Sequence, residues 1–262
     1  MKTCIRWLAL AAACLAVLAP RAEAQGRSGS NRQVVVSAAV SLTEVLQQLA
    51  PMYQATTGDR VVLNLGSSNT LARQISFGAG VDLFISADEA QMNAVAAQID
   101  SASRVDLLSN QLAIAVPDDR PATLSSARDL VHPAIRRIAM GDPSAVPAGV
   151  YAKQYLQMLG IWADLAPKVV PSGSVRLALT AVESGAADAA IVYHTDIATA
   201  AHAREALVIP LAEGPRIVYP AAVVRAGKNQ EGGRRLLAFL RTPEAIAVFT
   251  RAGFIAPAAA RN

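Results

Sequence analysis

Residues 34–44 read Val-Val-Val-Ser-Ala-Ala-Val-Ser-Leu-Thr-Glu. The β-branched run at the start of this stretch predicts a strand, and the small residues after it predict a tight turn into a helix. Ser41 and Glu44 have the spacing of a capping box, in which a serine side chain caps the first turn of a helix. A strand that turns directly into a helix also points free backbone N–H groups outward, together with the positive end of the helix dipole. The stretch predicts an α/β fold, with either a simple helix cap or an anion-binding turn.

The same arrangement recurs at three later positions in the chain. Small or hydroxyl residues again separate a strand candidate from a helix candidate at 66–69, 141–149 and 172–175. Small side chains let a compact ligand approach the backbone. Lys and Arg do not recur at the four junctions. Helix N-termini without a basic side chain favour an anion that is held by many neutral hydrogen-bond donors. Arg73 and Arg176 lie slightly inside their helices, where we expect solvation or pairing with acidic side chains.

Short β-branched runs alternate with Ala-rich stretches of helical period along most of the chain. The runs predict strands at 34–37, 61–65, 83–86, 112–116, 138–140, 189–193 and 221–224. The stretches between them predict helices at 42–56, 70–77, 148–159, 175–184, 230–240 and 243–251. This alternation is typical of an α/β protein with largely parallel sheets.

Two polar stretches interrupt the alternation, at 109–111 and 211–216. We interpret them as crossings between two lobes, so that residues 31–109 and 218–262 form lobe 1 and residues 110–217 form lobe 2. Ligands of open α/β sheets bind outside the carboxyl ends of the strands. In a two-lobed chain this places the predicted site in the cleft between the lobes.

The N-terminal residues predict export. Lys2 and Arg6 precede an apolar run at 7–18, and the small-x-small pattern read by signal peptidase follows at 22–24. The apolar run is too short to span a bilayer. We therefore interpret residues 1–24 as a cleaved signal peptide and expect a periplasmic protein.

The Gly- and Ser-containing residues 25–30 predict a flexible leader. Both cysteines, Cys4 and Cys14, precede this leader, so the predicted mature chain has none. Cys14 is an alternative lipidation site, but the apolar run continues past it. Removing three basic residues and one acidic residue lowers the formal net charge from +4 to +2, which argues against a nucleic-acid binder.

An enzyme is the main alternative from another functional class. Ser41 or Ser68 could act as a nucleophile, with helix N-termini forming an oxyanion hole, as in a serine hydrolase. The sequence has no G-x-S-x-G elbow and no Walker A loop, and no recognisable motif places a histidine beside either serine. The three histidines are isolated and lack metal-ligand spacing. We therefore predict a binding protein rather than an enzyme.

A set of ordered motifs carries a resemblance to a known family. The motifs are Ala-Val-Ser-Leu-Thr (39–43), Ser-Ser-Asn-Thr-Leu-Ala-Arg-Gln (67–74), Asp-Leu-Phe-Ile-Ser-Ala-Asp (82–88), Gly-Asp-Pro (141–143), Val-Pro-Ala-Gly-Val-Tyr-Ala-Lys (146–153), Val-Arg (175–176) and Ile-Val-Tyr (191–193). Together they make the chain resemble the periplasmic molybdate-binding proteins of bacterial ABC transporters. The similarity extends over essentially the whole predicted mature chain, in order and with compatible spacing.

The resemblance implies a two-lobed type II periplasmic-binding fold with molybdate, or tungstate, enclosed between the lobes. It implies that Ser41 and Ser68 donate hydroxyl and backbone hydrogen bonds, that Ala148 and Val175 donate backbone N–H groups, and that Tyr193 donates its phenol. The resemblance thus implies that these residues bind the metal through the oxygens of the oxyanion and not as a bare ion. Without the resemblance, Tyr193 would be interpreted as a core tyrosine.

The resemblance also implies a monomer without a cofactor, which delivers its ligand to an inner-membrane ABC permease with its ATPase. Sulfate, phosphate or a small organic anion remain alternative ligands. Two positions depart from the family pattern. Val40 replaces the small residue that usually precedes the first serine, and Asn69 replaces a common serine after the second. Both changes retain the predicted donors but can alter the shape of the cleft.

Overall fold

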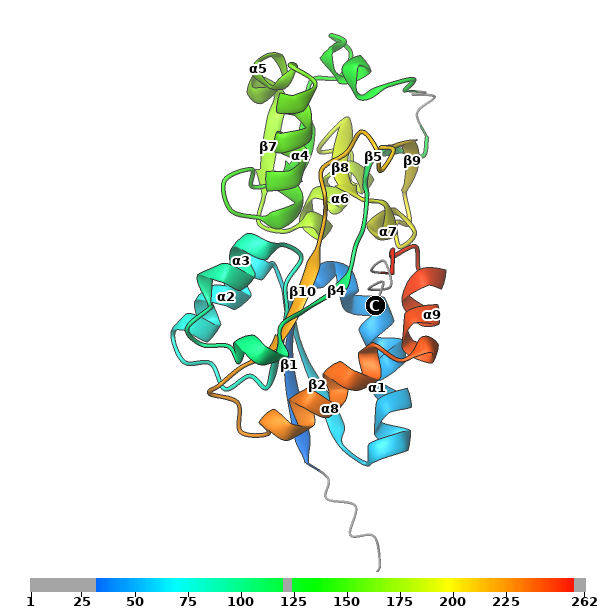
Figure 1. Cartoon of the computed structure of the whole chain (residues 1–262). Helices are drawn as coiled ribbons and strands as arrows, with labels where there is room; N and C mark the ends of the chain where they lie inside the picture. The colour runs from blue at the N-terminus through cyan, green and yellow to red at the C-terminus, as the bar shows by residue number, and fades with distance from the viewer. Residues whose placement is uncertain (1–31, 120–123, 257–262) are drawn as a thin grey trace, which may run out of the picture.

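The computed structural model describes residues 32–119 and 124–256 of the 262-residue chain (Figure 1). These residues form two five-stranded sheets with helices packed against each of them, so the protein has two α/β lobes. The predicted α/β class and two-lobed fold are confirmed. The predicted signal peptide (1–24) and leader (25–30) lie outside the described residues. No helix within the described part is long and apolar enough to span a bilayer.

The sheet of the first lobe has the strand order β2-β1-β3-β10-β4. β1 is parallel to both β2 and β3, and Val36 at its centre pairs with Leu63 on one side and Leu83 on the other. β10 is antiparallel to β3 and to β4. The strands are β1 (Gln33–Ala39), β2 (Arg60–Gly66), β3 (Leu83–Ile85), β4 (Val105–Leu108) and β10 (Tyr219–Val223).

The sheet of the second lobe has the order β7-β6-β8-β5-β9. β6 is parallel to β7 and β8, and its Ile138 pairs with Val169 and Ala189. β5 is antiparallel to β8 and to β9. The strands are β5 (Leu112–Pro117), β6 (Ile138–Gly141), β7 (Val169–Ser172), β8 (Ala189–Tyr193) and β9 (Ala203–Val208).

The two sheets therefore share one topology. β1 and β6 occupy equivalent positions, and each is flanked by two parallel strands; the next strand, β10 or β5, runs in the opposite direction, and the last, β4 or β9, runs in the direction of the first three. The expectation of largely parallel sheets holds for four of the five strands in each sheet, and β10 and β5 are the exceptions. β5 and β10 are the strands by which the chain enters each sheet from the other lobe, and each runs against the other four strands of its sheet.

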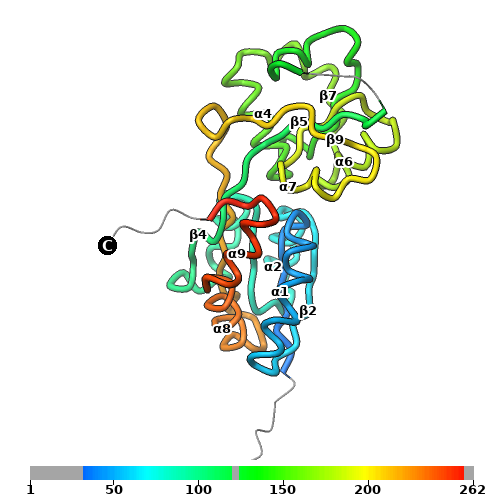
Figure 2. Tube along the Cα trace, turned by 90° about the vertical axis from the view of Figure 1, so that its right-hand side faces the viewer, coloured from blue at the N-terminus to red at the C-terminus, as the bar shows by residue number. Residues whose placement is uncertain are grey.

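The chain changes sheets twice. β4 ends at Leu108 in the first sheet and β5 begins at Leu112 in the second, whereas β9 ends at Val208 and β10 begins at Tyr219. Figures 1 and 2 show the two connecting segments running side by side between the lobes. Asn110, in the shorter connection, is buried.

Helices cover both faces of the first sheet. Side chains alternate between the two faces of a strand, so Leu83 and Ile85 join the main core while Phe84 packs with α2 and α3 in a separate cluster. The helices α1, α8 and α9 pack together on the main-core side (Figure 1). The helices of this lobe are α1 (Thr43–Thr57), α2 (Ser68–Ser76), α3 (Glu89–Ala94), α8 (Gln230–Leu240) and α9 (Pro243–Arg251), with 3-10 turns η1 (Val40–Leu42) and η2 (Ser101–Ser103).

In the second lobe, α4 and α6 pack directly on the sheet. Pro147 is the first residue of α4, where its missing N–H removes no helical hydrogen bond. The helices are α4 (Pro147–Met158), α5 (Trp162–Leu165), α6 (Val175–Glu183) and α7 (His194–Ile197), with 3-10 turns η3 (Ala127–Val131) and η4 (Ala166–Lys168). All six predicted helices are present, and α8 and α9 have the predicted bounds.

Candidate functional site

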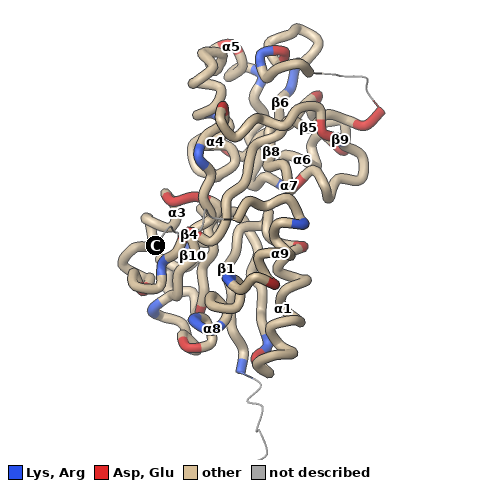
Figure 3. Tube along the Cα trace, turned by 45° about the vertical axis from the view of Figure 1, so that its right-hand side comes forward, with Lys and Arg blue, Asp and Glu red and all other residues tan. Residues whose placement is uncertain are grey.

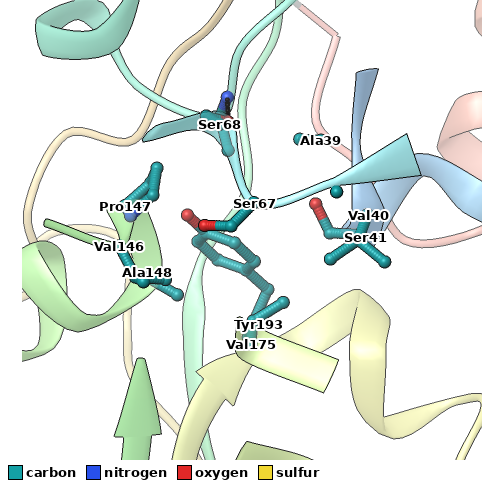
Figure 4. Close-up of a pocket in the computed structure, with 12 residues that line it drawn as sticks. Ala39, Val40, Ser41, Ser67, Ser68, Val146, Pro147, Ala148, Val175 and Tyr193 are labelled. Carbon is teal, nitrogen blue, oxygen red and sulfur yellow. Dashed lines mark hydrogen bonds between the residues drawn. The ribbon is translucent and has the colours of Figure 1, made fainter. Parts of the chain in front are cut away.

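The five predicted site residues line one pocket between the lobes (Figure 4). The pocket has about 220 Å³ of empty space, part of it open to solvent. No charged residue of the described chain lines it, and Figure 3 shows Lys, Arg, Asp and Glu scattered over both lobes. The lining residues are Ala39, Val40, Ser41, Gly66, Ser67, Ser68, Ala87, Val146, Pro147, Ala148, Val175 and Tyr193.

Four strand-to-helix junctions build the pocket, two from each lobe. They follow β1, β2, β6 and β7, which are the equivalent pairs of strands in the two sheets. Ser68 and Val175 are the first residues of their helices, and Ala148 is the second residue of α4. Backbone N–H groups at these positions have no partner within their own helix and lie at the positive end of its dipole. The four junctions predicted from small residues therefore bring uncharged hydrogen-bond donors together at the pocket.

The Ser68 hydroxyl group is held in one hydrogen-bonding role. Its side chain is buried, and its Oγ accepts a hydrogen bond of 2.9 Å from the backbone N–H of Ala87. Because an N–H can only donate, the hydroxyl hydrogen of Ser68 remains free to donate in turn. The neighbouring Ser67 donates to Asn69 Oδ1 at 2.6 Å, so Asn69 fixes a side chain in the pocket wall.

The predicted capping box at Ser41 is wrong. Ser41 lies inside η1, and no side-chain cap is formed at the start of η1 or of α1. The 3-10 turn inserts residues between the strand and α1, so that Leu42 becomes the N-cap of α1. Ser41 is instead buried at the pocket, with its Oγ 3.0 Å from the phenol oxygen of Tyr219. Glu44, the predicted partner in the box, binds Arg176.

Tyr193 places an unpaired hydroxyl group in the pocket wall. It is the last residue of β8, its side chain is 1% exposed, and its phenol oxygen has no hydrogen-bond partner among the described residues. Burial raises the pKa of the Tyr193 phenol well above its ordinary value, so the group stays protonated and can donate. Buried polar groups in native proteins are nearly always paired. An unpaired one that lines a pocket indicates a ligand.

Two glycines let the N-terminus of α4 approach the end of β6. A Cβ atom on Gly149 would collide with the carbonyl oxygen of Gly141, and a Cβ on Gly141 would collide with the side chain of Val146. The close contact sets the position of the first turn of α4, which carries Ala148. Glycine is therefore required here for packing and not for an unusual backbone angle.

An ion-pair network that the sequence analysis missed joins the lobes beside the pocket. Arg176, which follows Val175 on α6, donates to both carboxylate oxygens of Glu44 on α1, at 3.0 and 2.6 Å. Its Nε also donates to Asp196 at 2.7 Å. The expected pairing of Arg176 with acidic side chains is confirmed. No pattern in the sequence indicates that one of these partners is Glu44 in the other lobe.

The acidic residues of the 82–88 motif have structural contacts. Asp82 accepts from the backbone N–H groups of Val35 and Asn229, at 2.7 and 2.6 Å, and ties β1 to the start of α8. Asp88 caps α3 by accepting from Gln91 N–H at 2.8 Å. Within residues 32–119 and 124–256, no group of three His, Cys, Asp or Glu is placed to hold a metal ion.

The comparisons identify the class of protein. The sequence model of the family described as bacterial extracellular solute-binding proteins matches residues 34–255, and the chain belongs to this family. The molybdate-binding protein ModA of Escherichia coli K12 is 37% identical over 257 residues, which cover 95% of this chain and 98% of that one.

Two solved structures have the same fold. The periplasmic molybdate-binding protein of Azotobacter vinelandii has a TM-score of 0.77 and 26% identity, covering 86% of this chain and all of that one. The sulfate-binding protein SubI of Mycobacterium tuberculosis has a TM-score of 0.73 over 85% of this chain and 86% of that one. Its 17% identity shows likeness of fold alone.

Proposed function

We propose that the protein captures molybdate in the periplasm and delivers it to an ABC importer. Ser41 and Ser68 donate hydroxyl and backbone hydrogen bonds to the oxyanion, Ala148 and Val175 donate backbone N–H groups, and Tyr193 donates its phenol. The observation that carries the proposal is a pocket lined by donors from both lobes, in which the buried Tyr193 hydroxyl lacks a partner among the described residues. The similarity of the chain to molybdate-binding proteins supports the choice of ligand.

The donor set favours an anion that carries no proton. Molybdate near neutral pH is a fully deprotonated dianion, so all its oxygens accept hydrogen bonds. Monohydrogen phosphate carries an O–H group that needs an acceptor, and none of the five proposed contacts is a carboxylate. Burying an unpaired O–H group costs about 1–3 kcal/mol, so phosphate should bind weakly.

Sulfate is the second candidate ligand, because it is also a dianion that only accepts and the fold is shared with a sulfate-binding protein. A pocket of donors can reject sulfate only through size. The shorter bonds of sulfate would leave some donors beyond good hydrogen-bond distance. Tungstate has the same shape and charge as molybdate, so we expect it to bind as well.

The proposed lobe boundaries place the two crossings near residues 109–110 and 217–218. We propose that residues 31–109 with 218–262 form lobe 1 and that residues 110–217 form lobe 2.

The proposed role also implies how the protein works with its partners. We expect a monomer that needs no cofactor, catalyses no reaction and docks on an inner-membrane permease with its ATPase. A signal peptide ending at residue 24 would place the protein in the periplasm, and N-terminal sequencing of exported protein should then begin at Gln25.

Titration calorimetry against molybdate, tungstate, sulfate and phosphate tests the proposal. We expect tight binding of molybdate and tungstate, weaker binding of sulfate and little binding of phosphate. Sulfate or phosphate binding as tight as that of molybdate would contradict both the ligand and the donor argument.

A further inference from the structure

Tyr219 lies behind Ser41, outside the residues that line the pocket. It is the first residue of β10 and is fully buried, and its phenol oxygen is 3.0 Å from Ser41 Oγ. The same oxygen is 3.4 Å from the side-chain amide nitrogen of Asn110. Asn110 stands in the crossing between β4 and β5, so the contact chain runs from that crossing through Tyr219 to Ser41.

The chain of contacts has a defined direction. Asn110 Oδ1 accepts from the backbone N–H of Gln111 at 2.9 Å, which fixes the orientation of the amide. The amide nitrogen can then only donate, so Tyr219 accepts from Asn110. Within the described residues, Ser41 Oγ is the acceptor found for the phenolic hydrogen of Tyr219. The reverse direction would leave this hydrogen buried and unpaired, which is unfavourable.

We propose that Tyr219 is a positioning residue that determines the selectivity of the site by fixing Ser41 as a donor. The proposal rests on the proposed function. Because Tyr219 donates to Ser41 Oγ, the hydrogen of Ser41 is directed to the ligand and its oxygen is already engaged. The backbone N–H of Ala87 does the same for Ser68. Both serines in the pocket then donate to the ligand and do not accept from it.

Removing the Tyr219 hydroxyl should change selectivity as well as affinity. In Tyr219→Phe the Ser41 hydroxyl loses its fixed orientation, and we expect molybdate affinity to fall about tenfold, the effect of one ordered hydrogen bond. The freed Ser41 oxygen can accept the O–H of monohydrogen phosphate. We therefore expect phosphate affinity to rise while molybdate affinity falls. The ratio of molybdate affinity to phosphate affinity should then fall by more than tenfold.

The test is calorimetry of the full protein at pH 8 with molybdate and with inorganic phosphate. Tyr53→Phe is the matched control, because Tyr53 is also fully buried and its hydroxyl bonds to Asp59 and Gly232, away from the pocket. It should leave both affinities unchanged. In a Ser41→Ala background, Tyr219→Phe should have no further effect on the ratio, because Tyr219 acts through Ser41.

An unchanged ratio of molybdate to phosphate affinity in folded Tyr219→Phe protein would overturn the proposal. The proposal would also be overturned if Tyr219→Phe changed this ratio as much in the Ser41→Ala background as in the unaltered protein. Failure of the unaltered protein to bind molybdate would instead overturn the proposed function. If Tyr219→Phe does not fold, neutron diffraction of the unaltered protein with molybdate decides the question. Deuterium on Tyr219 directed at Ser41 supports the proposal, and deuterium on Ser41 directed at Tyr219 overturns it.

Discussion

Replacing Tyr193 by phenylalanine should weaken ligand binding without weakening the fold. The phenol oxygen is buried and unpaired among the described residues, so its removal deletes no internal hydrogen bond. A hydrogen bond to a charged group contributes about 1.5–3 kcal/mol, and the expected loss of molybdate affinity is therefore about ten- to 150-fold. Calorimetry measures this loss directly. Unchanged affinity would mean that the ligand does not contact Tyr193.

The stability of the ligand-free Tyr193→Phe variant provides the second half of the test. A buried hydroxyl without a partner carries a desolvation penalty of about 1–3 kcal/mol, so the variant should be as stable as the parent or more stable. For a protein of this size, 1 kcal/mol corresponds to a shift of roughly 2–4 °C in melting temperature. Tyr53→Phe, which removes a hydroxyl whose single hydrogen faces two acceptors, Asp59 Oδ2 at 3.4 Å and the Gly232 carbonyl oxygen at 3.3 Å, should lower the melting temperature. If Tyr193→Phe lowers it equally, Tyr193 has an internal partner.

Three further changes test the surroundings of the pocket. Glu44→Gln should raise the rate of molybdate dissociation by up to about fivefold, because a half-exposed pair with Arg176 contributes about 0.2–1 kcal/mol; stopped-flow measurements showing no change would exclude a role for this pair in closure. Gly149→Ala should lower both melting temperature and affinity, because its Cβ would collide with Gly141; an unaffected variant would show that α4 can shift freely. Burial, opposed by Arg176, raises the pKa of Asp196 from 3.8 to about 6, so the native state binds more protons than the unfolded state between these values. The free energy of unfolding should therefore decline by at most about 3 kcal/mol as pH rises through 6, and urea titrations of Asp196→Asn should lack this slope.

The sequence predicts the central strands of both sheets and the edge strand β2, but not the edge strands β4 and β9. The expected bounds of α8 and α9 match the structure, in which Asn229 and Thr242 cap the two helices. The strands β4 and β9 were missed because they lie at sheet edges, where charged residues such as Asp106 and Arg204 interrupt the apolar pattern. The helices α3, α5 and α7 are only four to six residues long, which is too short for a helical period to be visible.

The residues that contact the pocket could be predicted, whereas those that support them could not. Small residues at strand ends mark a close approach to the backbone, and this signal indicates the junctions of Ser68, Ala148 and Val175, whereas Tyr193 is predicted only through the family resemblance. Tyr219 stands in an apolar strand and contacts Ser41 across 178 positions of sequence, so no local pattern relates the two. The capping box at Ser41 failed because sequence spacing does not reveal a 3-10 turn inserted before a helix.

The shared topology of the two sheets has a consequence for the energetics of release. Equivalent strands in the two lobes supply the junctions, so the proposed donors are divided between two bodies joined by two crossings. Hydrogen bonds weaken steeply with distance and angle. A small rotation of one lobe would therefore lengthen all contacts of that lobe together and not one after another. Dissociation should then be cooperative within a single binding site, with few partly bound intermediates.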